Sequence, residues 1–322
     1  MTILGKKQMS EEDIKLNYIT PVILDGWKGH VTMETKITDG RINISGNIVA
    51  RSKPKFADYM LYLNDGKPIA VVEAKDNNHS VSHGLQQAMT YAQMMDLPFA
   101  YSSNGDAFYE HDFLTGQEQQ IALEEFPTQE MLVARYYAEL HSGKGISDME
   151  KKIVSQPYYS SQSTYPPRYY QRNAVNRTVE AIARGQQRLL LVTGTGKTYT
   201  AFQIVYRLLR SDLKKRILYL ADRNILVDQS ILQDFAPLEK TIYKVDFSDK
   251  ACLSKIASRE VNFALYHQMV GQNDEEHFKQ IPAEYFDLII VDECHRGSAK
   301  EDSNWRKVLE YFSSATQIGM TA

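Results

Sequence analysis

Residues Leu189–Thr198 read Leu-Leu-Leu-Val-Thr-Gly-Thr-Gly-Lys-Thr, an apolar run that passes directly into a glycine-rich loop. The apolar part is strand-length, and the residues after the loop favour a helix that extends to Leu209. Glycines in such a loop let backbone N–H groups close around phosphate groups at the start of the helix. The stretch therefore predicts a strand, a phosphate-binding loop and a helix.

The side chains at the end of this loop suit a nucleotide. We expect Lys197 to reach the β- and γ-phosphates and the Thr198 hydroxyl to ligate Mg²⁺. The predicted contacts to the phosphates are Thr193, Gly194, Thr195, Gly196, Lys197 and Thr198.

A second motif follows the apolar run Leu288–Val291, where the chain reads Asp-Glu-Cys-His over residues 292–295. We expect Asp292 to hold Mg²⁺ through its shell, and Glu293 to position or deprotonate the hydrolytic water. Each motif alone is also compatible with a glycine turn or a charged strand end. Both motifs together, in this order, indicate a site for ATP and Mg²⁺.

The sequence around these motifs alternates between strand-like and helical patterns. We expect strands at 189–192, 216–221, 263–266, 288–292 and 315–322, and helices at 198–209 and 224–235. Alternation of this kind is typical of a parallel sheet wrapped by helices. The second half of the chain therefore predicts a doubly wound α/β domain.

The first half has a different pattern, that of a mixed α/β domain. Helices are expected at 10–19 and 82–95, and strands at 41–49, 56–63, 68–74 and 98–102, with a hairpin turn at 64–66. From Ile146 to Pro167 the composition shifts to Ser, Gln, Tyr and Pro. We therefore predict a domain over 1–145, a linker over 146–165 and a second domain over 166–322.

Two neighbouring strands of the first half carry Asp58 and, 15 residues later, Glu73. A turn between the strands brings both carboxylates to the same end of a hairpin, and Lys75 faces the same side as Glu73 because strand side chains alternate. Oxygen ligands suit Mg²⁺, so we expect Asp58, Glu73 and the carbonyl of Ala74 to hold the ion. Lys75 would orient the attacking water. Glu-x-Lys alone often occurs by chance on exposed strands. Here an apolar run precedes it, which places both charges at the end of a buried strand, where they are costly unless they are paired or bind a metal.

Other candidate ligands in the first half have simpler interpretations. Glu12 could add a carboxylate to the metal shell, but its place near a helix start favours a helix-dipole and capping role. His79 and His83 are four residues apart and could bind a metal, yet no third ligand lies nearby in the sequence. A solvated helix start is the favoured interpretation for this pair.

The chain resembles the R subunits (HsdR) of type I restriction enzymes. The resemblance is carried by Phe-Ala-Asp-Tyr at 56–59, Val-Glu-Ala-Lys at 72–75 and Gln-Ala-Met-Thr-Tyr-Ala at 87–92. It implies a PD-(D/E)xK restriction-endonuclease-like domain. In that family a Gln-x-x-x-Tyr motif supports the active site, and Gln87 and Tyr91 match it.

The second half is similar to superfamily-two helicases and translocases through Asp-Glu-Cys-His at 292–295. Arg168, Tyr170 and Gln171 resemble the adenine-reading segment of that family, with Gln171 for the base edge and Tyr170 for stacking, although surface packing is the alternative for the aromatic residues. Residues 221–229 resemble a DNA-backbone-contacting motif, and residues 319–322 a motif that couples hydrolysis to strand movement. The implied fold is a RecA-like, doubly wound lobe.

These resemblances imply an ATP- and Mg²⁺-dependent DNA endonuclease and translocase subunit that acts on double-stranded DNA. Its implied partners are the modification (methyltransferase) and specificity subunits. Two alternatives stay open: a repair or defence helicase whose nuclease-like domain only binds DNA, and a non-catalytic assembly module.

The sequence departs from the family pattern at two places. The family usually has Met-Ala between the strand and the loop, whereas Val192 runs straight into Thr193, so the loop is about two residues short. The chain also stops at Ala322, before the second RecA-like lobe that supplies arginine fingers. We therefore do not expect translocation by this chain alone.

Composition restricts the compartment and the partners. The formal net charge of −3 argues against a globally basic nucleic-acid binder, although local basic grooves remain compatible with it. The N-terminus lacks an apolar secretory core, and apolar runs are too short for a bilayer span, so we expect a cytoplasmic protein without membrane contact. Two cysteines, Cys252 and Cys294, are too few for a disulfide framework.

Overall fold

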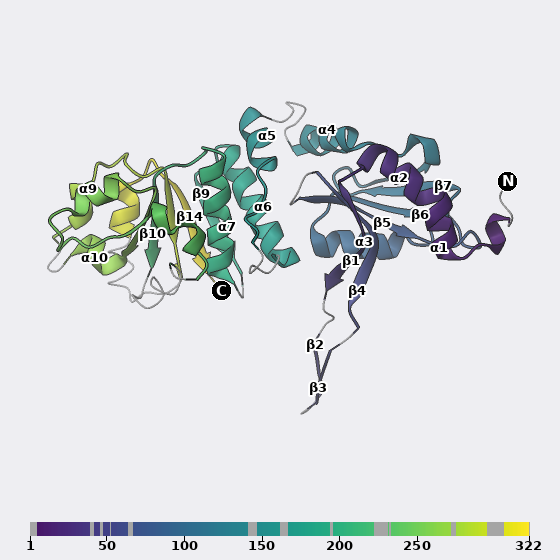
Figure 1. The fold of residues 1–322 in the computed structure, drawn as a ribbon, viewed down its shortest axis with the longest axis horizontal. Coiled ribbons are helices and arrows are strands. Elements are labelled where there is room, and N and C mark those ends of the chain that lie inside the picture. The colour runs from purple at the N-terminus through teal and green to yellow at the C-terminus, as the bar shows by residue number, and fades with distance from the viewer. Residues whose placement is uncertain are drawn as a thin grey trace. The chain divides into compact units, whose positions relative to one another are not determined.

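The computed structural model describes residues 5–38, 42–45, 48–51, 53–63, 67–140, 147–161, 167–193, 196–221, 231, 233–271, 275–294 and 306–321. The chain divides into two compact units, Met1–Ser147 and Asp148–Ala322 (Figure 1). None of the described helices combines the length and the apolar character that a membrane span requires.

The first unit is a mixed sheet with helices packed against it. Its helical segments are η1 (Lys6–Gln8), α1 (Glu11–Ile14), η2 (Lys15–Ile19), α2 (Thr20–Trp27), α3 (Leu85–Met95), η3 (Leu123–Glu125) and α4 (Gln129–Leu140). Its strands are β1 (Val31–Thr38), β2 (Ile42–Ser45), β3 (Ile48–Arg51), β4 (Lys55–Tyr62), β5 (Pro68–Ala74), β6 (Phe99–Ser103), β7 (Ala107–Asp112) and β8 (Gln117–Ala122).

The six-stranded sheet of this unit has the order β1-β4-β5-β6-β7-β8. The β5–β6 pair is parallel, because α3 forms the crossover between these strands, and the other pairs are antiparallel. β5 is buried along its whole length, and its sequence is apolar except for Glu73. Trp27 closes one part of the core, where its indole N–H donates to the carbonyl of Pro127 at 2.9 Å.

The prediction of one strand in the first unit is wrong. Residues 41–49 were expected to form a single strand, but β2 and β3 pair as an antiparallel hairpin that extends from the ends of β1 and β4 (Figure 1). The sequence between these strands is Gly-Asn, a dipeptide that favours a hairpin turn. The prediction of one strand followed the alternation of apolar residues and did not take this dipeptide into account. Residues 46 and 47 themselves, and the turn expected at 64–66, lie outside the described residues.

The second unit is a parallel sheet with helices between its strands. Its helical segments are α5 (Asp148–Val154), α6 (Tyr169–Ala183), α7 (Lys197–Arg210), η4 (Ala236–Thr241), α9 (Cys252–Ala257), α10 (Tyr266–Val270) and η6 (His277–Gln280). Its strands are β9 (Arg188–Val192), β10 (Ile217–Ala221), β11 (Ile242–Lys244), β12 (Val261–Leu265), β13 (Leu288–Val291) and β14 (Thr316–Thr321).

All pairs of this sheet are parallel, in the order β11-β12-β10-β13-β14-β9. The strands expected at 189–192, 216–221, 263–266, 288–292 and 315–322 lie at β9, β10, β12, β13 and β14 to within two residues at each end. The helix expected at 224–235 falls largely outside the described residues.

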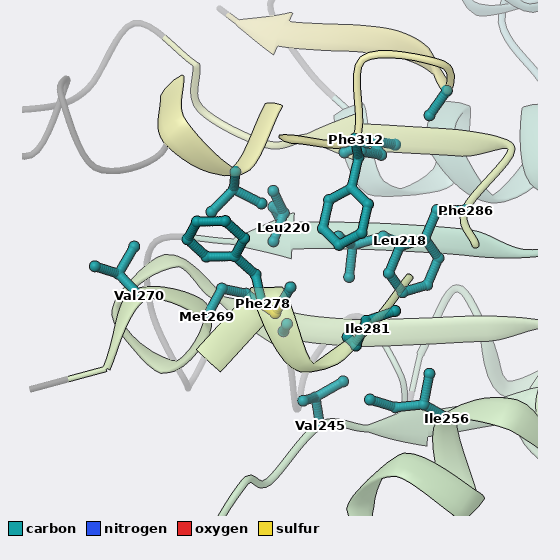
Figure 2. Close-up of a cluster of buried hydrophobic side chains, with 14 of the residues drawn as sticks. Leu218, Leu220, Val245, Ile256, Met269, Val270, Phe278, Ile281, Phe286 and Phe312 are labelled. Carbon is teal, nitrogen blue, oxygen red and sulfur yellow. The ribbon is translucent and has the colours of Figure 1, made fainter. Parts of the chain in front are cut away.

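An apolar core packs against one part of this sheet. Figure 2 shows Leu218 and Leu220 of β10 facing Phe278, Phe286 and Phe312. These side chains are buried almost completely. Because the strands end at one common edge, this core fixes where the motifs at the carboxyl ends of β13 and β14 lie.

The segment expected to be a linker contains regular structure. Residues 148–154 form α5, whose Ile153 side chain is buried. Glu150 of α5 is also buried and accepts from Arg184 Nε at 2.8 Å. The charged and short α5 pattern lacks a long apolar stripe, so its packing could not be read from periodicity.

Candidate functional sites

The carboxylates of Asp58 and Glu73 lie side by side at the end of the β4–β5 pair. Regular pairing of these strands ends at Tyr59 and Val72. Beyond that pair, Asp58 Oδ2 accepts from the backbone N–H of Ala74 at 2.7 Å, and Glu73 Oε1 accepts from the backbone N–H of Asp58 at 3.3 Å. Each acid is therefore fixed by the backbone of the opposite strand.

Burial dominates the electrostatics of Glu73. Its side chain is 1% exposed, and this burial, with the charge of Asp58, raises the pKa of Glu73 to about 8. Lys75 and the backbone N–H of Asp58 oppose the rise. A carboxyl group held in this way has a strong preference for a proton or another cation.

The Lys75 ammonium lies at the same end of the sheet. Its Nζ donates to the carbonyl oxygen of Ala74 at 2.7 Å and lies 3.9 Å from Glu11 Oε2. The structure thus brings together Asp58, Glu73, Lys75 and the Ala74 carbonyl, the four groups that the sequence grouped into one site.

A second lysine, Lys15, also belongs to this cluster, and it is not among the site residues predicted from the sequence. Its Nζ lies 2.5 Å from Asp58 Oδ1, and its side chain is only 4% exposed. Burial alone would lower the pKa of Lys15, but hydrogen bonds to Asp58 and Glu12 raise it above the ordinary value. In the sequence Lys15 follows three acids in a predicted helix, where a lysine is usually solvated. Only tertiary packing distinguishes it.

The helix α3 covers the same region. Gln87 Nε2 donates to the Tyr91 hydroxyl at 3.1 Å, one helical turn away. Burial raises the pKa of Tyr91, the hydrogen bond from Gln87 opposes this, and the charges of Glu73 and Asp58 add to it. Just before α3, a Cβ at Gly84 would lie 3.3 Å from the Cβ of Glu73, so the helix start approaches the site closely.

The donors at this site fit Mg²⁺ in part. Two carboxylates and one backbone carbonyl are hard oxygen ligands, and Mg²⁺ commonly completes its shell with waters and substrate phosphates. Among the described residues, no group of three or more His, Cys, Asp or Glu side chains is arranged to hold a metal ion. The site therefore matches an ion that shares its shell with a phosphate, and does not match an all-protein metal cage.

The remaining metal candidates in the first unit have ordinary contacts. His79 Nδ1 lies 3.0 Å from Asp76 Oδ1, and its ring lies 4.3 Å from that of His83. Glu12 is exposed and accepts from Lys15 Nζ at 2.9 Å.

In the second unit, the phosphate-loop lysine contacts the predicted hydrolytic glutamate. Lys197 Nζ lies 3.0 Å from Glu293 Oε1. Thr193 is buried, and its N–H donates to the carbonyl of Thr321 at 3.0 Å. Lys197 and Thr198 form the first turn of α7, and Gly196 precedes it with φ of +71°. Gly194 and Thr195 lie outside the described residues.

Asp292 and Glu293 follow β13 in a constrained backbone. The Tyr266 hydroxyl donates to the Asp292 carbonyl at 2.8 Å, and Asp292 Oδ1 accepts from the Glu293 N–H at 3.0 Å. Glu293 has φ of +51°, a left-handed conformation that non-glycine residues seldom adopt. Burial, and then the charge of Glu293, raises the pKa of Asp292.

The predicted base-reading segment begins α6. Gln171 Oε1 accepts from the backbone N–H of Arg168 at 2.9 Å, and Arg168 Nη1 donates to the Tyr170 hydroxyl at 3.0 Å. A Cβ at Gly196 would collide with Nε2 of Gln171. The side chain expected to contact the base thus lies directly against the phosphate loop.

The two last motifs have different outcomes. Of the expected DNA-backbone motif at 221–229, Ala221 ends β10, and residues 222–229 lie outside the described residues, as does His295. Gly319 lies in β14, where an added Cβ would be 3.0 Å from Cys294 Sγ, and the Cys294 N–H donates to the carbonyl of Met320. The Asp292–Cys294 motif and the β14 motif are therefore in direct contact.

Comparison with known proteins gives consistent matches in both units. Residues 30–127 match the family described as "Type I restriction enzyme R protein N terminus (HSDR_N)", and residues 164–322 match "Type III restriction enzyme, res subunit". The whole chain aligns with the type I restriction enzyme EcoAI endonuclease subunit of Escherichia coli at 44% identity. The EcoKI endonuclease subunit of Escherichia coli K12 aligns with 82% of the chain at 28% identity.

A solved structure shows the same fold. A fragment assigned as an HsdR subunit of a type I restriction enzyme from Vibrio vulnificus YJ016 matches 98% of the chain with a TM-score of 0.77 and 37% identity. The chain covers 55% of that fragment, 40% of the EcoAI subunit and 27% of the EcoKI subunit. The predicted fold class and the predicted resemblance are both confirmed.

Proposed function

Because the chain belongs to the R subunits of type I restriction enzymes, we propose that its first unit cleaves DNA with Mg²⁺ and its second unit binds ATP in a DNA motor. The observation that carries the proposal is the Asp58–Glu73 pair with Lys75 beside it. Both carboxylates are buried, and burial of two neighbouring acids is costly unless cations or protons offset it.

The residues of the first unit would act by holding and orienting. When bound, Mg²⁺ would polarise the scissile phosphate and lower the pKa of the attacking water. Asp58, Glu73 and the Ala74 carbonyl would hold the ion, because hydrogen bonds to backbone N–H groups already fix both acids. The Lys75 ammonium would orient the water and stabilise negative charge on the phosphate oxygens.

Gln87 and Tyr91 would support this site. Their hydrogen bond holds both side chains on one face of α3, whose start packs against Glu73. Tyr91 would help to hold the carboxylates of the site in position, and Gln87 would orient the Tyr91 hydroxyl.

The second unit would bind ATP at the start of α7. Its loop amides, Lys197 and Thr198 would contact the phosphates and their Mg²⁺, with Asp292 in the shell of the ion. The Lys197–Glu293 contact supports this assignment, since a phosphate group would replace the carboxylate as the partner of Lys197. Glu293 would then be released to position the hydrolytic water. Arg168, Tyr170 and Gln171 would contact the adenine.

As an R subunit, the protein would act on double-stranded DNA in complex with modification and specificity subunits. The test is to compare Asp58→Ala and Glu73→Ala with the wild type in the reconstituted complex. We expect loss of cleavage with retained DNA binding. Cleavage at the wild-type rate by either variant would instead favour a helicase whose nuclease-like unit only binds DNA.

A further inference from the structure

Among the described side chains outside the proposed machinery, Lys15 has an unusual environment. Its ammonium is surrounded by four carboxylates: Asp58 Oδ1 at 2.5 Å, Glu12 Oε1 at 2.9 Å, Glu34 Oε1 at 3.4 Å and Glu11 Oε1 at 3.6 Å. The lysine is nearly buried, whereas Glu12 and Glu34 are largely exposed. A lysine seldom lies at such depth unless it is paired.

The backbone places Lys15 there by a local irregularity. Lys15 begins η2, a single π-helical turn between α1 and α2, and such turns often occur at functional sites. The capping box of Ser10 and Asp13 fixes the start of α1, one turn before Lys15. Glu34 lies in β1, opposite Asp58 of β4, and its φ of +48° is not that of a regular strand.

Charge explains why a lysine is useful at this position. Asp58 has one oxygen on the Ala74 N–H and the other on Lys15, so Lys15 is the cation that directly balances this buried acid. The four acids around Lys15, together with Lys15 and the Lys75 ammonium 3.9 Å from Glu11, carry a net charge of −2 when all are ionised. The cluster is held together by the lysine and still attracts a further cation.

We propose that Lys15 is a resident counter-cation of the nuclease site: it keeps Asp58 in place without metal, and it competes with the divalent ion for that carboxylate. The inference rests on the proposed metal-dependent cleavage. Lys15 is thus a positioning residue that also sets how tightly the site binds its metal ion.

Two opposite effects decide the result of removing the Lys15 charge. Loss of an orienting partner typically weakens metal binding by roughly 10- to 100-fold. Repulsion between an ammonium and a doubly charged ion that share one carboxylate acts at close range, and we expect it to be the larger effect. We therefore expect the neutral variant to bind the ion more tightly. A lysine that is only a structural ion pair would give weaker or unchanged binding.

The experiment is a calorimetric titration of the DNA-free protein with Mn²⁺, for the wild type, Lys15→Met and Lys15→Arg. We expect Lys15→Met to lower the Kd by about tenfold or more, and Lys15→Arg to stay near the wild type. Lys255→Met is the matched control, because Lys255 lies 2.5 Å from Asp249 but is half exposed and in the other unit. It should leave the Kd unchanged.

Thermal unfolding gives a second readout if Lys15→Met folds poorly. In chelator, Lys15→Gln should have a lower Tm than the wild type. Adding Mn²⁺ should raise the Tm of Lys15→Gln by more than it raises that of the wild type. Both differences should disappear when Asp58→Asn is also present. Weaker or unchanged Mn²⁺ binding in Lys15→Met, with Asp58→Asn still abolishing binding, overturns the inference and leaves the proposed function intact. Mn²⁺ binding that survives Asp58→Asn overturns the proposed metal site itself.

Discussion

Among single residues, the sequence predicts the two acids of the candidate nuclease site better than it predicts the lysine that pairs with one of them. Asp58 and Glu73 could be paired from the turn between two strands and from the apolar run before Glu73. Lys15 could not be assigned to the same site, because its contact with Asp58 crosses 43 residues and depends on one π-helical turn. Side chains that meet through tertiary packing leave no periodic signal.

The pKa of Glu73 predicts a pH dependence of stability in metal-free buffer. The ordinary value is 4.5 and the folded value is about 8, so the folded state binds the proton more tightly. This contribution is fully present below the unfolded pKa and is lost as the pH rises through the folded pKa. Between about pH 6 and pH 8.5, the wild type should lose about 2 kcal/mol more than Glu73→Gln. Urea unfolding at both pH values in chelator measures this, and parallel pH profiles would contradict it.

Gly319 predicts a steric link between the two motifs of the second unit. Gly319→Ala would place its Cβ 3.0 Å from Cys294 Sγ, so we expect a loss of about 1–3 kcal/mol in the free energy of unfolding and lower ATP turnover. Cys294→Ala removes the sulfur and should recover part of both losses in the double variant. Additive losses in the double variant would show that the contact does not matter.

Among the strands, the positions of the mainly apolar ones were predictable from the sequence, and the position of a mainly polar one was not. β10 and β13 are apolar runs, β5 is apolar apart from Glu73, and the sequence located each of them. β8 is mostly exposed, with the sequence Gln-Glu-Gln-Gln-Ile-Ala, and it forms a strand only because β7 provides a partner. Propensity contains no information about that partner.

A charge network links α4 to β7, beside the buried Leu132 and Tyr137 of the same helix. Arg135 donates to both oxygens of Glu110 and to Asp112 Oδ2, and the Tyr101 hydroxyl also donates to Glu110. Arg135→Met would leave two buried acids without their cation. Because Arg135 is a third exposed, we expect a loss of about 2 kcal/mol, less than for a fully buried pair.

The matched control for this prediction is Lys151→Met, since the Lys151–Asp148 pair is exposed and should contribute little. Urea unfolding of both variants measures the difference. Equal stability of the two variants would show that the α4 network is not stabilising.

Helix α3 predicts a ranking of nuclease defects. Gln87→Ala and Tyr91→Phe remove one hydrogen bond beside the site, whereas Lys75→Ala removes a charge within it. We expect the two α3 variants to slow cleavage by roughly 10- to 100-fold and Lys75→Ala to slow it more. Single-turnover cleavage rates test the order, and a Gln87→Ala defect as large as that of Lys75→Ala in a folded protein would reverse it.

At the scale of the whole molecule, each unit has its own sheet, its own buried core and its own candidate site. The change from mixed patterns to strand–helix alternation was visible in the sequence, and the division into two units follows it. What the sequence could not supply is the neighbourhood of each site, such as Gln171 against Gly196 or Gly319 against Cys294. Such contacts depend on strand order, which composition and periodicity do not encode.

We propose that this chain combines a metal-dependent nuclease and a separate ATP site. The most direct measurement records DNA cleavage and ATP hydrolysis in the same reaction, with the complex assembled around Lys75→Ala. We predict that cleavage falls by about a thousandfold while ATP hydrolysis stays within about twofold of the wild type, because Lys75 and Lys197 lie in separate units. Undiminished cleavage by Lys75→Ala would show that Lys75 does not act in DNA cleavage.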